Sequence, residues 1–341
     1  MNASLLWPGA RSSFSIVSRP PVLKRSRTWE VVPGPARGDL SAVSYGNGSW
    51  LALGVDPGVV LRSVDGIGWE QAPASSGPTG VTALKFLHDR FIAKGASQWK
   101  QSFDGVTWSD FPIPPGSVVN DVTHARGSWV CVGAAGLFAS AQEPGEWEVN
   151  QNATTSSPVH QVIYLGGRFH AYSYWSTGMQ PFSSRDGHTW TIHPQTNGIW
   201  FDHLERGQIE RAGGSVETVV VGTLQGGAYH IGRAAGESLT WETGKREGVF
   251  GRLIYRRSAD PAGPGLARRE WVSLTRGHSA RGGLPVFSLR TAGEAPVFEN
   301  TDTLNGILAV ATGPGAMIAV GTGGLIRRYP TGLTSGRPLS A

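Results

Sequence analysis

Apolar and polar residues alternate over short stretches of this chain, and a glycine-rich turn interrupts each stretch. Residues 40–54, for example, form two apolar-rich runs on either side of Gly46, Asn47 and Gly48. Alternation with a period of two places one row of side chains in a core and the other in solvent. Each stretch therefore predicts a β-hairpin.

The hairpin of residues 40–54 recurs along the chain. Each copy ends at a small residue, and successive end residues are 38 to 55 positions apart. Such a period, with alternating apolar residues and glycine turns, is typical of the four-stranded blades of a β-propeller. The residues that end the copies are Gly54, Gly95, Gly133, Ser173, Gly222, Gly277 and Gly321.

The second half of a repeat adds a third strand, a tight hairpin and a fourth strand that opens with tryptophan. Three of these hairpins share the pattern Ser-x-Asp-Gly-x-x-Trp. Asp-Gly favours a hairpin because glycine accepts positive φ and aspartate accepts hydrogen bonds from the turn amides, and the tryptophan can pack over the turn. We therefore predict structural roles for Ser63, Asp65, Gly66, Trp69, Ser102, Asp104, Gly105, Trp108, Ser184, Asp186, Gly187 and Trp190.

These three hairpins resemble the Asp-box, or bacterial neuraminidase repeat, of a group of β-propellers that includes the sialidases. The match to Ser/Thr-x-Asp-x-Gly-x-x-Trp is approximate, because here glycine follows aspartate directly. In repeat form the resemblance covers residues 28–330. It implies a propeller in which the boxes lie on the blade rim, away from the axial pocket, so a catalytic role for their aspartates is not expected. Propellers of this kind also resemble domains of phage tails.

The two ends of the repeat region complement each other. The last repeat, at residues 308–329, lacks a strand that opens with tryptophan, and residues 28–33 have the form of that strand. Pairing the two would close the ring and remove exposed sheet edges. We therefore predict an all-β fold: a single seven-bladed β-propeller of four-stranded antiparallel blades over residues 28–330, with six or eight blades as alternatives. Residues 1–27 would form an amino-terminal arm, and residues 331–341 a carboxy-terminal tail.

The composition agrees with turn-dense β structure. The 341 residues include 48 Gly and 22 Pro, and the 13 Trp argue against disorder. No apolar run approaches the roughly 18 to 20 residues that cross a bilayer, and residues 1–11 lack the pattern of a secretory signal. Cys131, the single cysteine, lies in a strand-like segment, and we expect a buried, inert thiol. The expected location is a virion if the chain is phage-encoded, and otherwise the cytoplasm.

The net charge of +5 is concentrated at the amino end. Residues 1–27 hold five basic residues and no acidic residue, so the remaining 25 basic residues balance the 25 acidic ones. A basic arm ahead of a neutral domain could dock on an acidic partner surface or on nucleic acid, and a solvated leader without a partner is the alternative. The candidate docking residues are Arg11, Arg19, Lys24, Arg25 and Arg27.

Catalytic chemistry has little support in the pattern. A sialidase-like enzyme would need an arginine cluster, an aromatic nucleophile with its carboxylate base and a separate acid. The Arg-Ile-Pro motif that such enzymes share is missing. Asp39, Asp121 and Asp202 could line the axis, but their places at the starts of inner strands favour strand-end caps. The histidines show no metal-ligand spacing and the glycine-rich segments precede strands, so we expect neither a metal nor another cofactor.

The predicted loops suggest a binding face. In a propeller, the loop between the second and third strands and the connection to the next blade open on one side, so residues 171–178 and 197–203 should be neighbours, with Trp99 as an extension. Their aromatic and polar side chains would suit a sugar ring or a protein hot spot, and packing between blades is the alternative. The candidate residues are Tyr174, Trp175, Trp200, Phe201, Asp202 and His203.

We therefore favour a non-enzymatic structural or adhesive propeller, as in a phage tail or baseplate, that attaches to proteins or to a host surface. The expected partners are other proteins of a larger assembly, reached through the amino-terminal arm, and a surface glycan; neither a membrane nor a nucleic acid is favoured as a partner. This inference rests on architecture. A sialidase-like protein that binds or hydrolyses glycans and a cytoplasmic assembly factor are the alternatives.

Overall fold

The computed structural model describes the chain from residue 29 to residue 330, with gaps. The described ranges are 29–35, 38–56, 58–73, 77–150, 156–175, 178–199, 201, 203–210, 215–223, 229–243, 252–259, 267–274, 286–288, 297–300 and 306–330. Within these ranges the chain forms strands and turns and two short 3-10 segments, η1 (Ala134–Gly136) and η2 (Thr322–Gly324). No helix in them is long and apolar enough to span a membrane. The proposed arm and tail lie outside the described residues.

The strands of the described residues form seven antiparallel sheets. Each sheet is named below by its innermost strand. The β2 blade holds β2 (Leu40–Gly46), β3 (Ser49–Gly54), β4 (Val60–Ser63) and β5 (Glu70–Gln71); the β6 blade holds β6 (Ala83–Leu87), β7 (Arg90–Lys94), β8 (Trp99–Ser102) and β9 (Ser109–Asp110); the β10 blade holds β10 (Val119–Ala125), β11 (Ser128–Gly133), β12 (Phe138–Ala141) and β13 (Glu148–Val149).

The other four sheets follow the same plan. The β14 blade holds β14 (Val159–Leu165), β15 (Arg168–Trp175), β16 (Gly178–Ser184), β17 (Thr191–Ile192) and a fifth strand, β18 (Thr196–Asn197); the β19 blade holds β19 (His203–Glu210), β20 (Val216–Thr223), β21 (Tyr229–Ala235) and β22 (Ser238–Thr243); the β23 blade holds β23 (Arg252–Ala259), β24 (Ala267–Leu274), β25 (Val286–Ser288) and β26 (Val297–Asn300); the β27 blade holds β27 (Ile307–Gly313), β28 (Ala316–Gly321), β29 (Ile326–Pro330) and β1 (Glu30–Val32).

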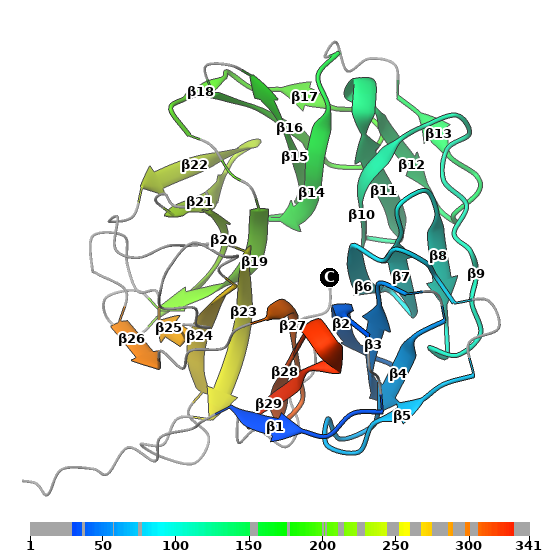
Figure 1. Ribbon diagram of the computed structural model, residues 1–341. Coiled ribbons are helices and arrows are strands. Elements are labelled where there is room, and N and C mark those ends of the chain that lie inside the picture. Colours follow the sequence, from blue (N-terminus) through cyan, green and yellow to red (C-terminus); the bar gives the residue numbers. More distant parts are fainter. Residues whose placement is uncertain are drawn as a thin grey trace, which may run out of the picture.

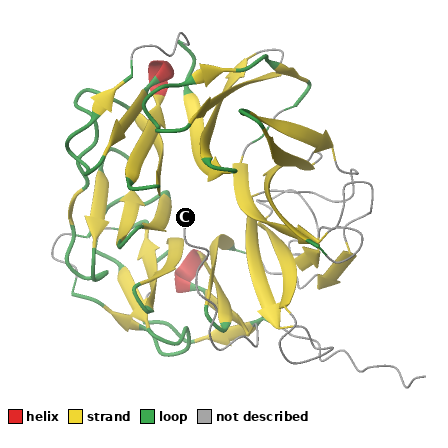
Figure 2. Ribbon diagram, turned by 180° about the vertical axis from the view of Figure 1, so that it is seen from behind, coloured by secondary structure: helices red, strands yellow, loops and turns green. Residues whose placement is uncertain are grey.

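The sheets stand side by side around a common centre, as Figure 1 shows, and Figure 2 shows the same arrangement from the opposite side. The innermost strands of successive blades contact each other, for example β10 with β14, β14 with β19, and β27 with β2. Radial antiparallel sheets with their first strands around an axis are the architecture of a β-propeller. The β-propeller fold expected from the repeat is therefore confirmed.

The strand nearest the amino end joins the last sheet. β1 pairs antiparallel with β29, so that Val32 lies opposite Ile326. The ring of Trp29 packs on that of Tyr329, with centroids 5.4 Å apart. Val32 and Ile326 also belong to the apolar cluster that joins the β27 blade to the β2 blade around Trp50. Side chains that precede the first complete repeat thus complete the core of the last one.

The three Asp-Gly hairpins have one geometry. In each hairpin, the serine Oγ accepts a hydrogen bond of 2.8 Å from the glycine N–H. The aspartate Oδ1 accepts bonds of 2.7 to 2.9 Å from the N–H groups two and three residues further on. The glycines have φ of +74° to +81°, and a Cβ at Gly187 would lie 2.3 Å from Val130 of the neighbouring blade. Only glycine therefore fits this turn without strain.

Candidate functional site

The turns and loops of the blades gather on two opposite faces. Asn47, in the first turn of the β2 blade, donates from Nδ2 to the carbonyls of Asp89 (2.9 Å) and Phe103 (2.8 Å). Phe103 belongs to an Asp-Gly hairpin, so first turns and Asp-Gly hairpins share one side, which we call the hairpin face. The other side, which we call the loop face, holds the loops between second and third strands and the connections between blades. Val118 lies in the connection that precedes β10, and Ala134 lies in the loop between β11 and β12. The carbonyl of Val118 accepts a hydrogen bond of 2.9 Å from Ala134 N–H, so the two segments share this face.

Polar and aromatic side chains follow one another across three blades on the loop face. Lys94 donates from Nζ to Asn120 O (3.0 Å), and Asn120 donates from Nδ2 to Val159 O, at the start of β14 (3.0 Å). The Lys94 ammonium lies 5.5 Å from the centre of the Trp99 ring, and the rings of His160 and Tyr174 are 4.4 Å apart. All of these side chains are partly exposed. We call Trp99, Lys94, Asn120, His160 and Tyr174 the loop-face row.

Bulges in the innermost strands place two residues of this row, Asn120 and His160. The register between first and second strands shifts at four blades and leaves one extra residue in the first strand of each. A bulge leaves its extra residue unpaired and re-aims the side chain. Two of these side chains bond the next blade: Asn120 as above, and Ser41, whose Oγ donates to Val81 O (2.6 Å). The extra residues are Ser41, Asn120, His160 and Leu308.

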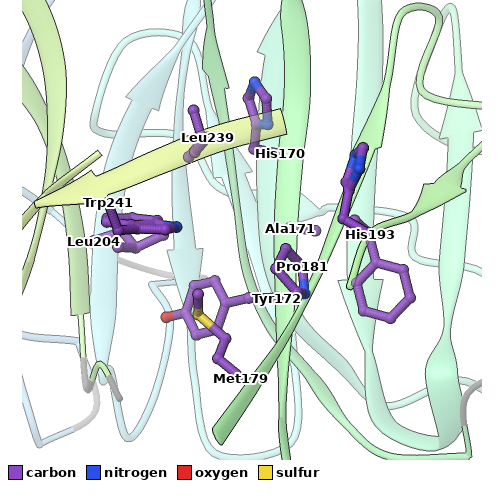
Figure 3. Close-up of a pocket in the computed structure, with 10 residues that line it drawn as sticks. His170, Ala171, Tyr172, Met179, Pro181, His193, Leu204, Leu239 and Trp241 are labelled. Atoms are coloured by element: carbon purple, nitrogen blue, oxygen red, sulfur yellow. The ribbon is translucent and has the colours of Figure 1, made fainter. Parts of the chain in front are cut away.

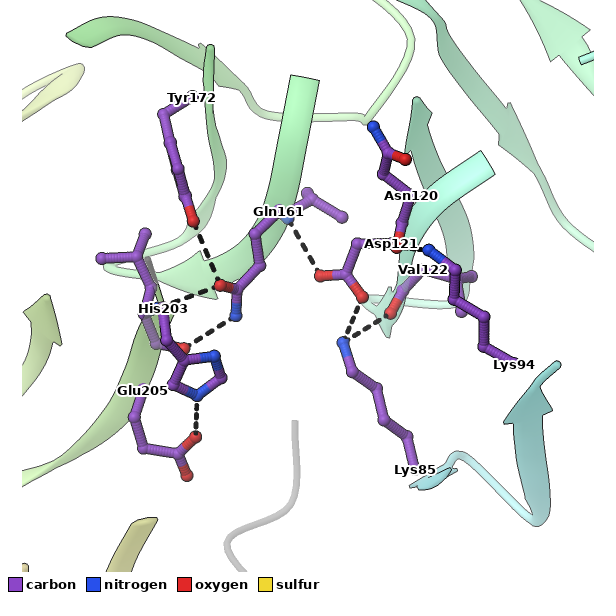
Figure 4. Close-up of polar contacts among 11 residues, drawn as sticks. Lys85, Lys94, Asn120, Asp121, Val122, Gln161, Tyr172, His203 and Glu205 are labelled. Atoms are coloured by element: carbon purple, nitrogen blue, oxygen red, sulfur yellow. Dashed lines mark hydrogen bonds and ion pairs between the residues drawn. The ribbon is translucent and has the colours of Figure 1, made fainter. Parts of the chain in front are cut away.

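Beside the row, a polar cluster lies on the innermost strands (Figure 4). Asp121 of β10 pairs with Lys85 of β6 through Oδ1 and accepts a bond from Val162 N–H of β14 through Oδ2 (3.2 Å). Lys85 also donates to Val122 O (3.3 Å). The Asp121 side chain is 9% exposed, so this carboxylate connects three consecutive blades in a largely buried place. A buried carboxylate needs such partners to offset its desolvation.

Gln161 makes the corresponding connection one blade further on. Its side-chain amide donates to Leu204 O (2.7 Å) and accepts from Leu204 N–H (2.9 Å), and Tyr172 OH donates to the same oxygen (3.3 Å). His203 Nε2 lies 3.4 Å from Glu205 Oε2 on the far side of this cluster from the lysines (Figure 4). Lys85 and Gln161 belong to no motif of the sequence and were not among the predicted site residues. Lys85 had one signal in the sequence, since it is the lone polar residue of the short apolar strand β6.

The candidate face residues have different environments. Tyr174 lies on the loop face, with its ring 5.5 Å from that of Tyr172. Phe201 is fully buried and packs on Trp241 with ring centroids 4.5 Å apart, so it forms blade core and no accessible stacking surface. His203 faces Glu205, as described above. The backbone of Trp175 pairs with Gly178. Trp200 and Asp202 lie outside the described residues.

Two other candidates from the sequence, Asp39 and Cys131, have defined positions. Asp39 Oδ1 accepts a hydrogen bond from Gly323 N–H (2.9 Å), a cap that connects the β2 and β27 blades. Cys131 is fully buried, and burial raises the pKa of its thiol, so the group is unreactive. Among the described residues, no group of three His, Cys, Asp or Glu side chains has a metal-binding arrangement. The basic residues of the proposed arm, Arg11, Arg19, Lys24, Arg25 and Arg27, lie outside the described part of the chain.

A narrow cavity lies between the β14 and β19 blades (Figure 3). Its volume of about 10 Å³ is room for about one water molecule. Ser183 Oγ and His193 Nε2 are 2.8 Å apart beside it, but Ser183 is fully buried and offers no surface to a substrate. Burial lowers the pKa of His170 to about 4, which keeps this imidazole neutral. The lining includes His170, Tyr172, Met179, His193, Leu204 and Trp241.

Comparisons with known proteins agree with the fold. No protein-family model matches the chain, including any of the Asp-box or sialidase kind, and a search of the curated proteins found no match. The chain is similar to solved structures. "YCF48 bound to D1 peptide" has 16% identity and a TM-score of 0.59, with 90% of this chain and 97% of that chain covered.

Two further structures are similar to the same extent. A catalytically inactive virginiamycin B lyase from Staphylococcus aureus with quinupristin has 8% identity and a TM-score of 0.59, covering 89% of this chain and 99% of that chain. A chain of the mitotic checkpoint complex has 13% identity and a TM-score of 0.58, covering 95% and 100%. YCF48 and the lyase are β-propellers with different ligands. Such similarity identifies the fold, and function has to be argued from the site.

Proposed function

We propose that this protein is a non-enzymatic binding module that attaches to a partner protein through the loop face of its propeller. The observation that carries the proposal is the loop-face row, because it joins partly exposed aromatic, cationic and amide side chains of three blades into one surface. Exposed apolar residues extend this face: Val55 is 44% exposed and Val118 is 65% exposed. Aromatic anchors with adjacent apolar and polar groups are characteristic of protein interfaces.

The finer architecture belongs to the same proposal. The seven sheets would be the blades of one seven-bladed ring over residues 28–330, which the pairing of β1 with β29 would close. The Asp-Gly hairpins would be structural Asp-boxes, as their side-chain bonds to turn amides support. Residues 1–27 would extend from the closure as a docking arm, and residues 331–341 would be a tail. Tyr174, Trp175, Trp200, Asp202 and His203 would contribute to the loop face.

The setting that we propose is a larger assembly, and a phage tail or baseplate is the one that the sequence analysis favours. Two structural neighbours support protein attachment as a use of this fold: one is bound to a D1 peptide, and the other belongs to the mitotic checkpoint complex. The adhesive alternative is a surface glycan on the same aromatic residues. A glycan array with the variants described next distinguishes it, because glycan recognition would give binding without a protein partner.

The test compares matched variants of the two faces. Val55→Asp with Val118→Asp changes the loop face, and Val64→Asp with Ile67→Asp changes the hairpin face, where the original side chains are 72% and 53% exposed. Chemical cross-linking in the producing cells, followed by mass spectrometry, measures recovery of the same partner protein. We expect the loop-face pair to lower recovery about tenfold, which corresponds to about 1.4 kcal/mol, and the hairpin-face pair to leave it unchanged.

Three outcomes would contradict the proposal. Equal recovery with both pairs would mean that neither face carries the contact. Loss with the hairpin-face pair alone would transfer the function to that face. Loss on removal of residues 1–27, with no effect of the loop-face pair, would assign attachment to the arm. All four altered side chains are exposed, so an unchanged melting temperature is the control for folding.

A further inference from the structure

Two lysines of the β6 blade approach one carboxylate of the next blade at the centre of the molecule (Figure 4). Lys85 pairs with Asp121, and Lys94 bonds the carbonyl of the preceding residue, Asn120. Glu205 lies across the cluster and faces His203. Among the described residues, Asp121 pairs with Lys85 and Glu205 pairs with His203, so the second ammonium group of this lysine pair has no paired carboxylate there.

The lysines also retain unused donors. An ammonium group has three N–H donors. Lys85 uses two of them, on Asp121 Oδ1 and Val122 O, and Lys94 uses one, on Asn120 O. One donor of Lys85 and two of Lys94 thus have no partner among the described residues. Lys85 has a side chain that is 31% exposed, so the group is accessible to a ligand.

The surroundings make this excess charge costly without a ligand. Burial lowers the pKa of Lys94, and the neighbouring Lys85 lowers it further, whereas Asp121 raises it. Trp99 covers one side of the Lys94 ammonium at 5.5 Å. A desolvated cation beside an aromatic ring attracts an anion more strongly than an exposed lysine does, because less solvent screens the interaction.

We propose that Lys85 and Lys94 together bind a carboxylate side chain of an acidic peptide segment. Each of the two oxygens of a carboxylate can accept a charge-assisted hydrogen bond from an ammonium group. A peptide is the favoured source because Lys94 and Trp99 also belong to the loop-face row, so a bound chain would extend from the lysines along that surface. The assignment of the carboxylate to a protein rests on the proposed function; the anion site itself does not.

The experiment uses the whole chain with isotope-labelled lysine and follows the lysine side-chain signals by NMR. The probes are N-acetyl-Ala-Glu-Ala-amide, its Gln counterpart and inorganic phosphate, at constant ionic strength. We expect the Glu peptide alone to shift the Lys85 and Lys94 signals, with a dissociation constant on the order of 1 mM. Lys94→Met should weaken this binding about tenfold or more. Lys94→Met is the better variant because it removes only a bond to the backbone carbonyl of Asn120. Lys85→Met would instead leave the Asp121 carboxylate buried and poorly paired.

Lys100→Met is the matched control. Lys100 pairs with Asp110 on the outer half of the same blade (2.8 Å), so its loss should leave peptide binding unchanged. Equal binding of the Gln peptide, equal weakening by Lys100→Met, or shifts with phosphate and not with the Glu peptide would each overturn the inference. If the Glu peptide binds as expected but loop-face variants still recover the partner protein, the proposed function fails while the anion site stands.

Discussion

At the scale of single residues, side chains that bond nearby backbone groups fix the turns of the blades. The aspartates of the three hairpins, Asp65, Asp104 and Asp186, each accept two turn N–H bonds, and those bonds hold the pKa of Asp104 at about 2 although burial raises it. This role was predictable, because Asp-Gly determines its turn locally. The burial of Phe201 corresponds to the alternative of packing between blades. Loop position alone does not tell whether such an aromatic side chain turns inward or stays accessible.

The pH dependence of stability tests whether burial of one residue, His170, makes the fold sensitive to acid. Its pKa is about 4 in the folded chain against an ordinary value of 6.5, so between these pH values the unfolded chain takes up a proton that the folded chain does not. The free energy of unfolding should therefore fall as pH falls from about 6.5 to about 4, by roughly 3 kcal/mol for this group, and the loss should be complete below that range.

Urea unfolding at pH 7.5 and pH 4.5 measures the effect. His170→Gln should reduce the difference in the free energy of unfolding between pH 7.5 and pH 4.5, because the glutamine side chain does not titrate. The control is His188→Gln, which changes a histidine with a side chain that is 51% exposed. Identical pH dependence in the two variants would show that burial of His170 does not contribute to acid sensitivity.

At the scale of elements, the strands could be predicted from the sequence repeat. The bulges in these strands could not. Alternation and glycine turns located the hairpin of β2 and β3, and the form of a fourth strand that opens with tryptophan located β1. The bulge at Asn120 escaped prediction, because one extra residue changes neither the strand's composition nor its length noticeably. The side chains that connect blades, such as Gln161, were missed for another reason: their partners are backbone groups of the next blade, which a sequence pattern does not reveal.

Strand β1 offers an internal comparison. Val32 is 6% exposed in the cluster around Trp50 and Ile326, whereas Val31, on the same strand, is 64% exposed. Val32→Asp should lower the free energy of unfolding by about 3 kcal/mol, because it buries an unpaired charge, and Val31→Asp by less than about 0.5 kcal/mol. Urea unfolding measures both. A small effect of Val32→Asp would show that β1 does not stabilise the last sheet.

At the scale of the whole molecule, architecture and function separate. The propeller followed from the spacing of its repeats, and solved propellers of similar shape have different ligands. Function therefore depends on which face carries accessible side chains that can still donate or accept hydrogen bonds. The loop-face row draws its five residues from three consecutive blades, over residues 94 to 174, so no single motif marks it. The net charge of the chain does not reveal the local excess at Lys85 and Lys94 either.

The most direct measurement of the central claim is site-specific photo-cross-linking of the full-length protein in the cells that produce it. A photoreactive amino acid replaces Val118 on the loop face in one variant and Val64 on the hairpin face in the other; these side chains are 65% and 72% exposed. We expect a discrete protein adduct from position 118 and none from position 64. An adduct from position 64 alone, or from neither position, would contradict it.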